Sequence, residues 1–180
     1  MKDRFSELDA LRGLAVLLMV LYHTAFDLDY FWGWTVLRNL GVGGWFLART
    51  SAVLFLLVAG ICFTLSWEHT PPSHRFQKTA KRFLILAGAA TLVSFATWLI
   101  APQDFVKFGI LHLFALSSLL LPLFAPLKHW NSLFGLLLIL LSSYLLPPIP
   151  YPLLMILLGS PPPTFSSLDY FPLLPWFGVL

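Results

Sequence analysis

Residues 7–23 read ELDALRGLAVLLMVLYH, an apolar run with an arginine near its start and a histidine at its end. At about 100° per residue, Arg12 and His23 fall on one face of a helix, roughly 16 Å apart along its axis. Asp9 and Asp27 share that face, and we call Asp9, Arg12, His23 and Asp27 the polar stripe. Ionisable groups inside a bilayer usually face a bundle interior or a water-filled cavity. The stretch therefore predicts a membrane-spanning helix with one functional face.

The composition of the whole chain agrees with that helix. It is 58% hydrophobic and 11% charged over 180 residues, whereas a soluble domain carries about 25% charged residues. We therefore predict an all-α polytopic transmembrane helix bundle, one membrane-embedded domain over residues 1–180 with about six spans. The single cysteine, Cys62, excludes an internal disulfide. The net charge of +3 comes from basic residues beside the spans, so no nucleic-acid partner is expected.

The apolar runs set the expected positions of the spans. They lie at 8–26, 45–67, 83–101, 105–124 and 131–146. Residues 151–159 are too short to cross a hydrocarbon core of about 30 Å, so we expect them to be re-entrant or interfacial. A last apolar segment begins at Phe171 and stops at Leu180. It is also too short to span, and we expect a domain that is truncated at its C-terminal end.

The basic residues are unevenly divided between the two sides that alternating spans define. One side holds eight of the eleven, namely Lys2, Arg4, Arg12, Arg75, Lys78, Lys81, Arg82 and Lys128. The other side holds Arg38, Arg49 and Lys107. Because cytoplasmic loops carry the excess of Lys and Arg, this bias predicts an N-terminus in the cytoplasm and residues 68–82 as a cytoplasmic loop.

With this orientation, four polar side chains are predicted at a similar depth near the outer surface: His23, Asp27, Arg49 and His112. Asp27 lies one helical turn after His23 and could accept an imidazole N–H, which raises the basicity of the ring. His112 would be a second base, or a donor to an acceptor hydroxyl. Arg49 could stabilise developing negative charge. Both histidines could instead be ordinary interfacial or helix-pairing residues.

Arg12 lies at the inner end of the same helix, beside Asp9. A guanidinium there suits the phosphates of a donor arriving from the cytoplasm, because Arg binds phosphate through paired hydrogen bonds. It could instead be a membrane anchor that pairs with Asp9. The sequence lacks the HxxxH and ExxH spacings of common metal sites, so we predict no metal.

Residues 7–15 and the apolar run to His23 resemble the opening helix of transmembrane acyltransferases. Residues 52–66, 108–113 and 169–178 resemble bacterial relatives of the heparan-alpha-glucosaminide N-acetyltransferase catalytic domain. The resemblance implies that an acyl group, with acetyl expected, passes from cytoplasmic acyl-CoA to an extracytoplasmic sugar or glycan. Acyl-CoA would be a co-substrate, with no permanently bound cofactor. A histidine near the outer end of the early helices would act, which favours His23.

The same resemblance places the protein in a bacterial inner membrane, with the lipid bilayer, acyl-CoA and a glycan acceptor as its partners. A second hypothesis stays open, in which the chain is a non-enzymatic membrane protein. It would then be a small transporter or the partner subunit of a membrane complex. A continuous polar path from Arg12 to His23 would distinguish the enzyme from this alternative. The sequence specifies no oligomeric state.

Overall fold

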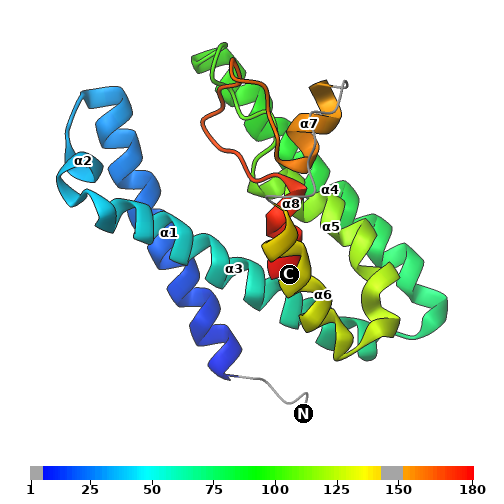
Figure 1. Ribbon diagram of the computed structural model, residues 1–180. Helices are drawn as coiled ribbons and strands as arrows, with labels where there is room; N and C mark the ends of the chain where they lie inside the picture. The colour runs from blue at the N-terminus through cyan, green and yellow to red at the C-terminus, as the bar shows by residue number, and fades with distance from the viewer. Residues whose placement is uncertain (1–5, 143–151) are drawn as a thin grey trace. The chain divides into compact units, whose positions relative to one another are not determined.

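A computed structural model describes residues 6–142 and 152–180 of the chain. Within these ranges the regular structure is helical, and the only strand-like pairing is an isolated parallel bridge between Phe108 and Tyr170 (Figure 1). The helices long and apolar enough to cross a membrane are α1 (Ser6–Trp32), α3 (Val42–Glu68), α4 (Pro72–Ile100) and α5 with the turn after it (Ile110–Leu127). The predicted all-α fold of an integral membrane protein is therefore confirmed.

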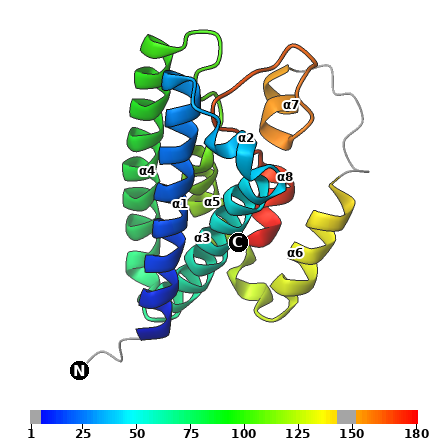
Figure 2. The ribbon, with the colours of Figure 1, turned by 90° about the vertical axis from the view of Figure 1, so that its left-hand side faces the viewer.

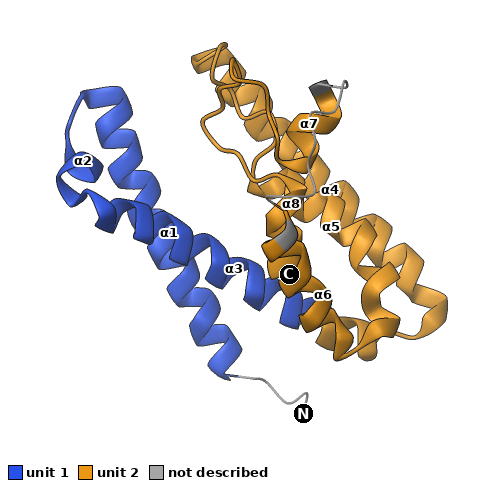
Figure 3. Ribbon diagram, in the orientation of Figure 1, with its two compact units in different colours: residues 1–63, 180 blue, residues 64–179 orange. Residues whose placement is uncertain are grey.

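The chain divides into two compact units, which are described separately (Figure 3). Unit 1 comprises residues 1–63 with Leu180, and it contains α1, the short helix α2 (Val36–Leu40) and most of α3. Helices α1 and α3 have 27 residues each, or about 40 Å at 1.5 Å per residue, which exceeds a hydrocarbon core of about 30 Å. Both are therefore long enough to reach the headgroup region on each side.

The turn between α1 and α3 is built around one carboxylate. Asp29, in the last turn of α1, accepts hydrogen bonds from the backbone amides of Val36 at 2.6 Å and Leu37 at 2.9 Å. These amides begin α2 and have no acceptor within that helix, so the carboxylate supplies the hydrogen-bond acceptor that they would otherwise lack. Gly41 then takes a φ of +51°, which favours glycine and reverses the chain into α3.

Unit 2 comprises residues 64–179 and is organised around α4 and α5, which lie side by side (Figures 1 and 2). The remaining helices are α6 (Trp130–Leu141), α7 (Pro152–Leu158), α8 (Leu173–Trp176) and a final 3-10 turn, η2 (Phe177–Val179). α6 packs on α8 and η2. Gly135 and Gly178 make that contact possible, because a Cβ at either one would collide with the backbone carbonyl oxygen of the other.

Several predicted boundaries are wrong. α4 begins at Pro72, so most of the predicted cytoplasmic loop 68–82 is helix. Proline suits the first helical turn, and no glycine or proline follows in residues 73–82 to interrupt the helix. α5 begins at Ile110 because residues 104–108 pair with 168–171 instead of continuing the helix. α6 has only 12 described residues and is shorter than a span; the rest of the predicted fifth span lies outside the described residues.

The two short C-terminal segments are confirmed as too short to cross a membrane. In residues 152–159 the structure describes α7, of 7 residues. The segment that begins at Phe171 forms α8 and η2, which fold back onto α6. Leu180 belongs to unit 1, where its carbonyl oxygen lies against the backbone of α3 at Gly60.

Candidate functional site

The N-terminal end of the polar stripe is linked to α3 by the Arg12 side chain. The Arg12 guanidinium forms an ion pair with Asp9, with 3.1 Å between nitrogen and oxygen. Its second terminal nitrogen lies 2.7 Å from the Cys62 sulfur on α3. Arg12 thus links α1 to α3, and the two helices run antiparallel with Arg12 and Cys62 at the same end. The Asp9–Arg12 pairing weighed from the sequence is present.

His23 and Asp27 lie further along α1, and both side chains are exposed. The His23 ring packs edge-on against Tyr22, with 5.6 Å between ring centroids. Although Asp27 is one turn away, no hydrogen bond joins it to His23 in the described part of the chain. Neither ring nitrogen of His23 is engaged there, so one of them can accept a proton and the other can donate one. The partnership of His23 with Asp27 stays a prediction.

Arg49 lies on α3 with its guanidinium carbon 5.8 Å from the centroid of the Trp45 ring, one turn earlier. The Arg12–Cys62 contact gives a common reference point for distances along α1 and α3. Measured from it, His23 lies about 16 Å along α1 and Arg49 about 20 Å along α3. Both are therefore displaced from Arg12 toward the turns that join α1, α2 and α3.

His112 belongs to unit 2 and lies in the first turn of α5, where both of its ring nitrogens are engaged. The backbone amide of Gly109 donates to Nδ1 at 3.2 Å. Nε2 lies 3.3 Å from the Ser94 hydroxyl oxygen on α4. An amide N–H can only donate, so Nδ1 is the acceptor and Nε2 carries the proton of the neutral ring. The Ser94 hydroxyl in turn donates to the carbonyl of Val106 at 2.6 Å.

This network decides what His112 can do. Its one lone pair is committed to the Gly109 amide, so it is not available to take a proton from a substrate. Ser94 is not activated as a nucleophile, because activation requires its O–H to point at an unprotonated Nε2. The arrangement leaves His112 a donor through Nε2–H and a brace between α4 and the start of α5.

Asp169 supports the same helix start and was not predicted as a site residue. Its Oδ2 accepts the backbone amide of Ile110 at 2.9 Å. The carboxylate lies directly against Gly109, where a Cβ would collide with it. A carboxylate at a helix N-terminus is also favoured by the helix dipole. The sequence did offer one indication of its importance, because Asp169 is the first residue of segment 169–178, one of the segments that carried the resemblance.

The segment around Asp169 is fixed by further polar contacts. The Ser167 hydroxyl lies 3.2 Å from the backbone amide of Lys107 and 2.8 Å from the carbonyl of Asp169. The Tyr170 hydroxyl donates to the carbonyl of Ile156 in α7 at 2.7 Å. Burial raises the pKa of the Tyr170 phenol to about 12, so this donor stays protonated at pH values where an exposed phenol ionises.

Of the predicted site residues, the structure brings Asp9 and Arg12 together. His23, Asp27 and Arg49 lie beyond them on the same two helices of unit 1, and His112 lies in unit 2. No group of three or more His, Cys, Asp or Glu side chains in residues 6–142 and 152–180 is arranged to hold a metal ion.

Comparison with known proteins adds one match. The model of the family described as "heparan-alpha-glucosaminide N-acetyltransferase, catalytic" matches residues 4–180, essentially the whole sequence. No curated protein and no solved structure matches the chain. The match confirms the resemblance drawn from residues 7–23 and the three later segments. The chain belongs to the heparan-alpha-glucosaminide N-acetyltransferase catalytic-domain family.

Proposed function

We propose that the chain is a membrane acyltransferase that moves an acetyl group from cytoplasmic acyl-CoA to a sugar or glycan on the opposite side. The observation that carries this proposal is the family match over residues 4–180. The long apolar helices agree with it, because they leave the chemistry to polar groups on the membrane-spanning segments.

His23 is the proposed general base. It takes a proton from the hydroxyl or amine of the acceptor as that atom attacks the acyl carbon. The carbon–sulfur bond of acyl-CoA breaks, a carbon–oxygen or carbon–nitrogen bond forms, and the proton leaves His23 for the CoA thiolate or water. The open ring nitrogens of His23 support this role, whereas the lone pair of His112 is already committed to Gly109. Asp27, one turn away, would orient the protonated ring.

Arg12 is the proposed donor-binding residue. Its two contacts, to Asp9 and Cys62, hold the guanidinium at the end of α1 that the charge bias assigns to the cytoplasm. A CoA phosphate arriving there would compete with the Asp9 carboxylate for the same nitrogens. Asp9 would thus position Arg12 when no donor is bound.

Arg49 and His112 are proposed supporting groups. Arg49 would stabilise negative charge on the acyl oxygen, as fixed cations do in acyl transfer. His112 would act through its Nε2–H as a donor to the acceptor hydroxyl, which requires that hydroxyl to replace Ser94 as the partner.

The test is transfer of label by the purified full chain in lipid vesicles. Acetyl-CoA labelled in its acetyl group is supplied with a mixture of amino sugars and neutral sugars, and both free CoA thiol and labelled sugar are measured. Equal amounts of the two products, absent after heating the protein, are expected. Absence of both, with folded protein and a donor shown to bind, would contradict the proposal and favour a transporter or partner subunit.

A further inference from the structure

Two cations from the start of α4 are fixed on one buried threonine in the turn between α3 and α4. Thr70 is only 7% exposed. Its carbonyl oxygen accepts a hydrogen bond from Arg75 Nε at 3.1 Å, and its hydroxyl oxygen accepts one from Lys78 Nζ at 2.8 Å. The Arg75 guanidinium also stacks over the Trp67 ring, 4.6 Å from its centroid. We call Trp67, Thr70, Arg75 and Lys78 the Thr70 corner.

These contacts use only some of the N–H donors of Arg75 and Lys78. Arg75 uses Nε for Thr70, and its two terminal amino groups have no hydrogen bond to any described residue. Lys78 uses one of the three N–H donors of its ammonium group. Each side chain is thus held by one hydrogen bond to Thr70, and its other N–H groups have no acceptor among the described residues. A pre-organised guanidinium beside an ammonium group is suited to a phosphate, which offers several acceptor oxygens.

The charge of the surrounding helix favours an anion. α4 contains no acidic residue over its whole length, Pro72–Ile100. Its first turns also carry Lys81, which adds to the positive charge at this end of the helix. Anionic lipid surfaces attract basic segments beside a membrane span, and the attraction falls off within a Debye length.

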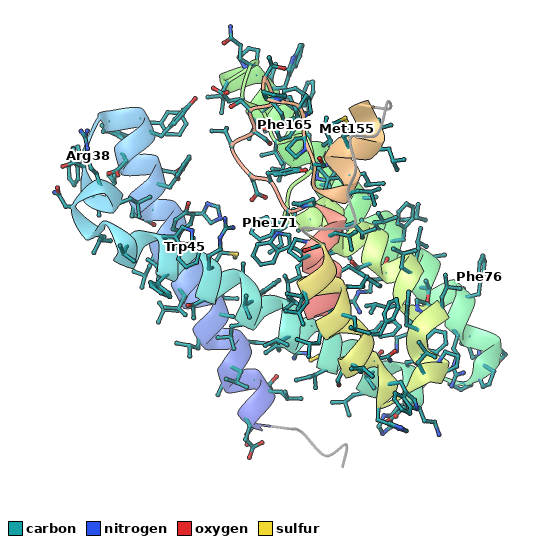
Figure 4. All side chains as sticks on the ribbon, viewed as in Figure 1. Arg38, Trp45, Phe76, Met155, Phe165 and Phe171 are labelled. Atoms are coloured by element: carbon teal, nitrogen blue, oxygen red, sulfur yellow. The ribbon has the colours of Figure 1, made fainter. Side chains whose placement is uncertain are left out.

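The position of the corner points to a lipid rather than a soluble anion. α4 has 29 residues, about 44 Å, and its apolar part starts near Phe83. Its first turns therefore extend past the hydrocarbon core into the headgroup region. Phe76, 85% exposed, projects outward from α4 (Figure 4), and in the sequence it lies between Arg75 and Lys78. Trp67 is an aromatic residue of the kind found at headgroup depth.

We propose that the Thr70 corner binds the phosphate of an anionic phospholipid headgroup. The phosphate oxygens would accept from the terminal nitrogens of Arg75 and from Lys78 Nζ, while Trp67 and Phe76 contact the glycerol and acyl region. This interaction is independent of the proposed acyl transfer and of which histidine performs it.

The test uses the full chain in phosphatidylcholine vesicles with trace spin-labelled phosphatidylglycerol or phosphatidylcholine, read by electron paramagnetic resonance. Wild-type protein should associate more strongly with labelled phosphatidylglycerol. The Arg75→Gln/Lys78→Gln variant should lose about tenfold or more in that association constant for each charge removed, because each side chain gives up a charged hydrogen bond to the phosphate. The matched control, Lys81→Gln/Lys128→Gln, removes two charges outside the corner and should lose only the diffuse attraction, at most about fivefold per charge. Equal losses in the two variants would overturn the proposal, because they would mean diffuse attraction without a built site.

Two further measurements test the site with a single substitution and distinguish a lipid phosphate from a soluble one. Lys78→Gln alone keeps Arg75 on Trp67, so it tests the corner even if the double variant does not fold. A loss of about tenfold or more is expected, and a loss of about fivefold or less, which diffuse attraction alone explains, contradicts the site. Inorganic phosphate and CoA are then added in excess, against sodium chloride of equal ionic strength. Neither should displace the labelled lipid, and displacement by either would assign the corner to soluble phosphates.

Discussion

Replacing Gly109 by alanine tests the cap at the start of α5 most sharply. Gly109 has an extended backbone, with φ −90° and ψ −174°, that alanine adopts without strain. A Cβ there would nevertheless collide with Asp169 Oδ2 and come within 2.8 Å of Val106 Cγ1. Overpacking of this kind costs about 1–3 kcal/mol. If Asp169 is displaced, its bond to the Ile110 amide is lost as well, worth about 1.5–3 kcal/mol for a charged acceptor.

The combined destabilisation of about 3 kcal/mol or more corresponds to a melting temperature lower by about 6–12 °C for a chain of this size. Gly88→Ala is the matched control, because Gly88 lies inside α4 with nothing within 4 Å of an added Cβ. It should raise the stability by about 0.5–1 kcal/mol. Thermal unfolding of both variants in detergent, followed by circular dichroism, makes the comparison. If Gly109→Ala melts at or above the wild-type temperature, Asp169 does not lie against Gly109 and the cap is refuted.

Three further outcomes are expected. Because the pKa of Tyr170 is about 12, above its ordinary 10.0, the folded protein keeps a proton that the unfolded chain loses; stability should therefore fall as pH rises from about 10 to about 12. Tyr170→Phe should flatten that fall and remove the late-titrating phenol from the absorbance at 295 nm; a late-titrating phenol that persists in the variant would show that Tyr170 is not the group with the raised pKa. Arg12→Gln should raise the KM for acyl-CoA with little change in kcat, as steady-state kinetics will show; a pure kcat effect would contradict donor binding. A cysteine at Ser73, in a Cys62→Ser background, should resist an impermeant thiol reagent in intact cells; labelling there would reverse the predicted orientation.

The spans were predictable because they depend on composition. An apolar run of about 20 residues has to be helical in a bilayer, whatever it packs against. This is why the predicted span 45–67 differs from α3 (Val42–Glu68) by only a few residues. The early start of α4 was missed because its charges suggested a loop, although Lys, Arg, Gln and Ala are all good helix formers.

The start of α5 depends on long-range contacts and was therefore missed. Nothing local in residues 105–109 stops a helix before Gly109. The stop comes from pairing with Tyr170 and from the Asp169 carboxylate, both about 60 positions later in the chain. Without homologous sequences or coordinates, a single chain contains no signal that brings these segments together.

The candidate site was predictable as a set of residues but not as a set of contacts. Helical spacing alone placed Asp9, Arg12, His23 and Asp27 on one face of α1. It could not give the contact of Arg12 with Cys62, which joins two helices. Nor could spacing identify Ser94 as the partner of His112, since α4 and α5 had first to be packed side by side. The tautomer of His112, and with it the limit on its chemistry, follows only from that packing.

The central claim is that His23 is the base and that His112 is not. It is tested by acetyl-transfer rates of His23→Ala and His112→Asn, measured in the same vesicles as wild-type protein. His23→Ala should lower the rate by about 10²–10⁴-fold while its melting temperature stays near that of the wild type. His112→Asn keeps an acceptor for the Gly109 amide but loses the supporting Nε2–H donor, so it should lower the rate far less than His23→Ala does. A fully active His23→Ala together with an inactive, folded His112→Asn would contradict the assignment and make His112 the base.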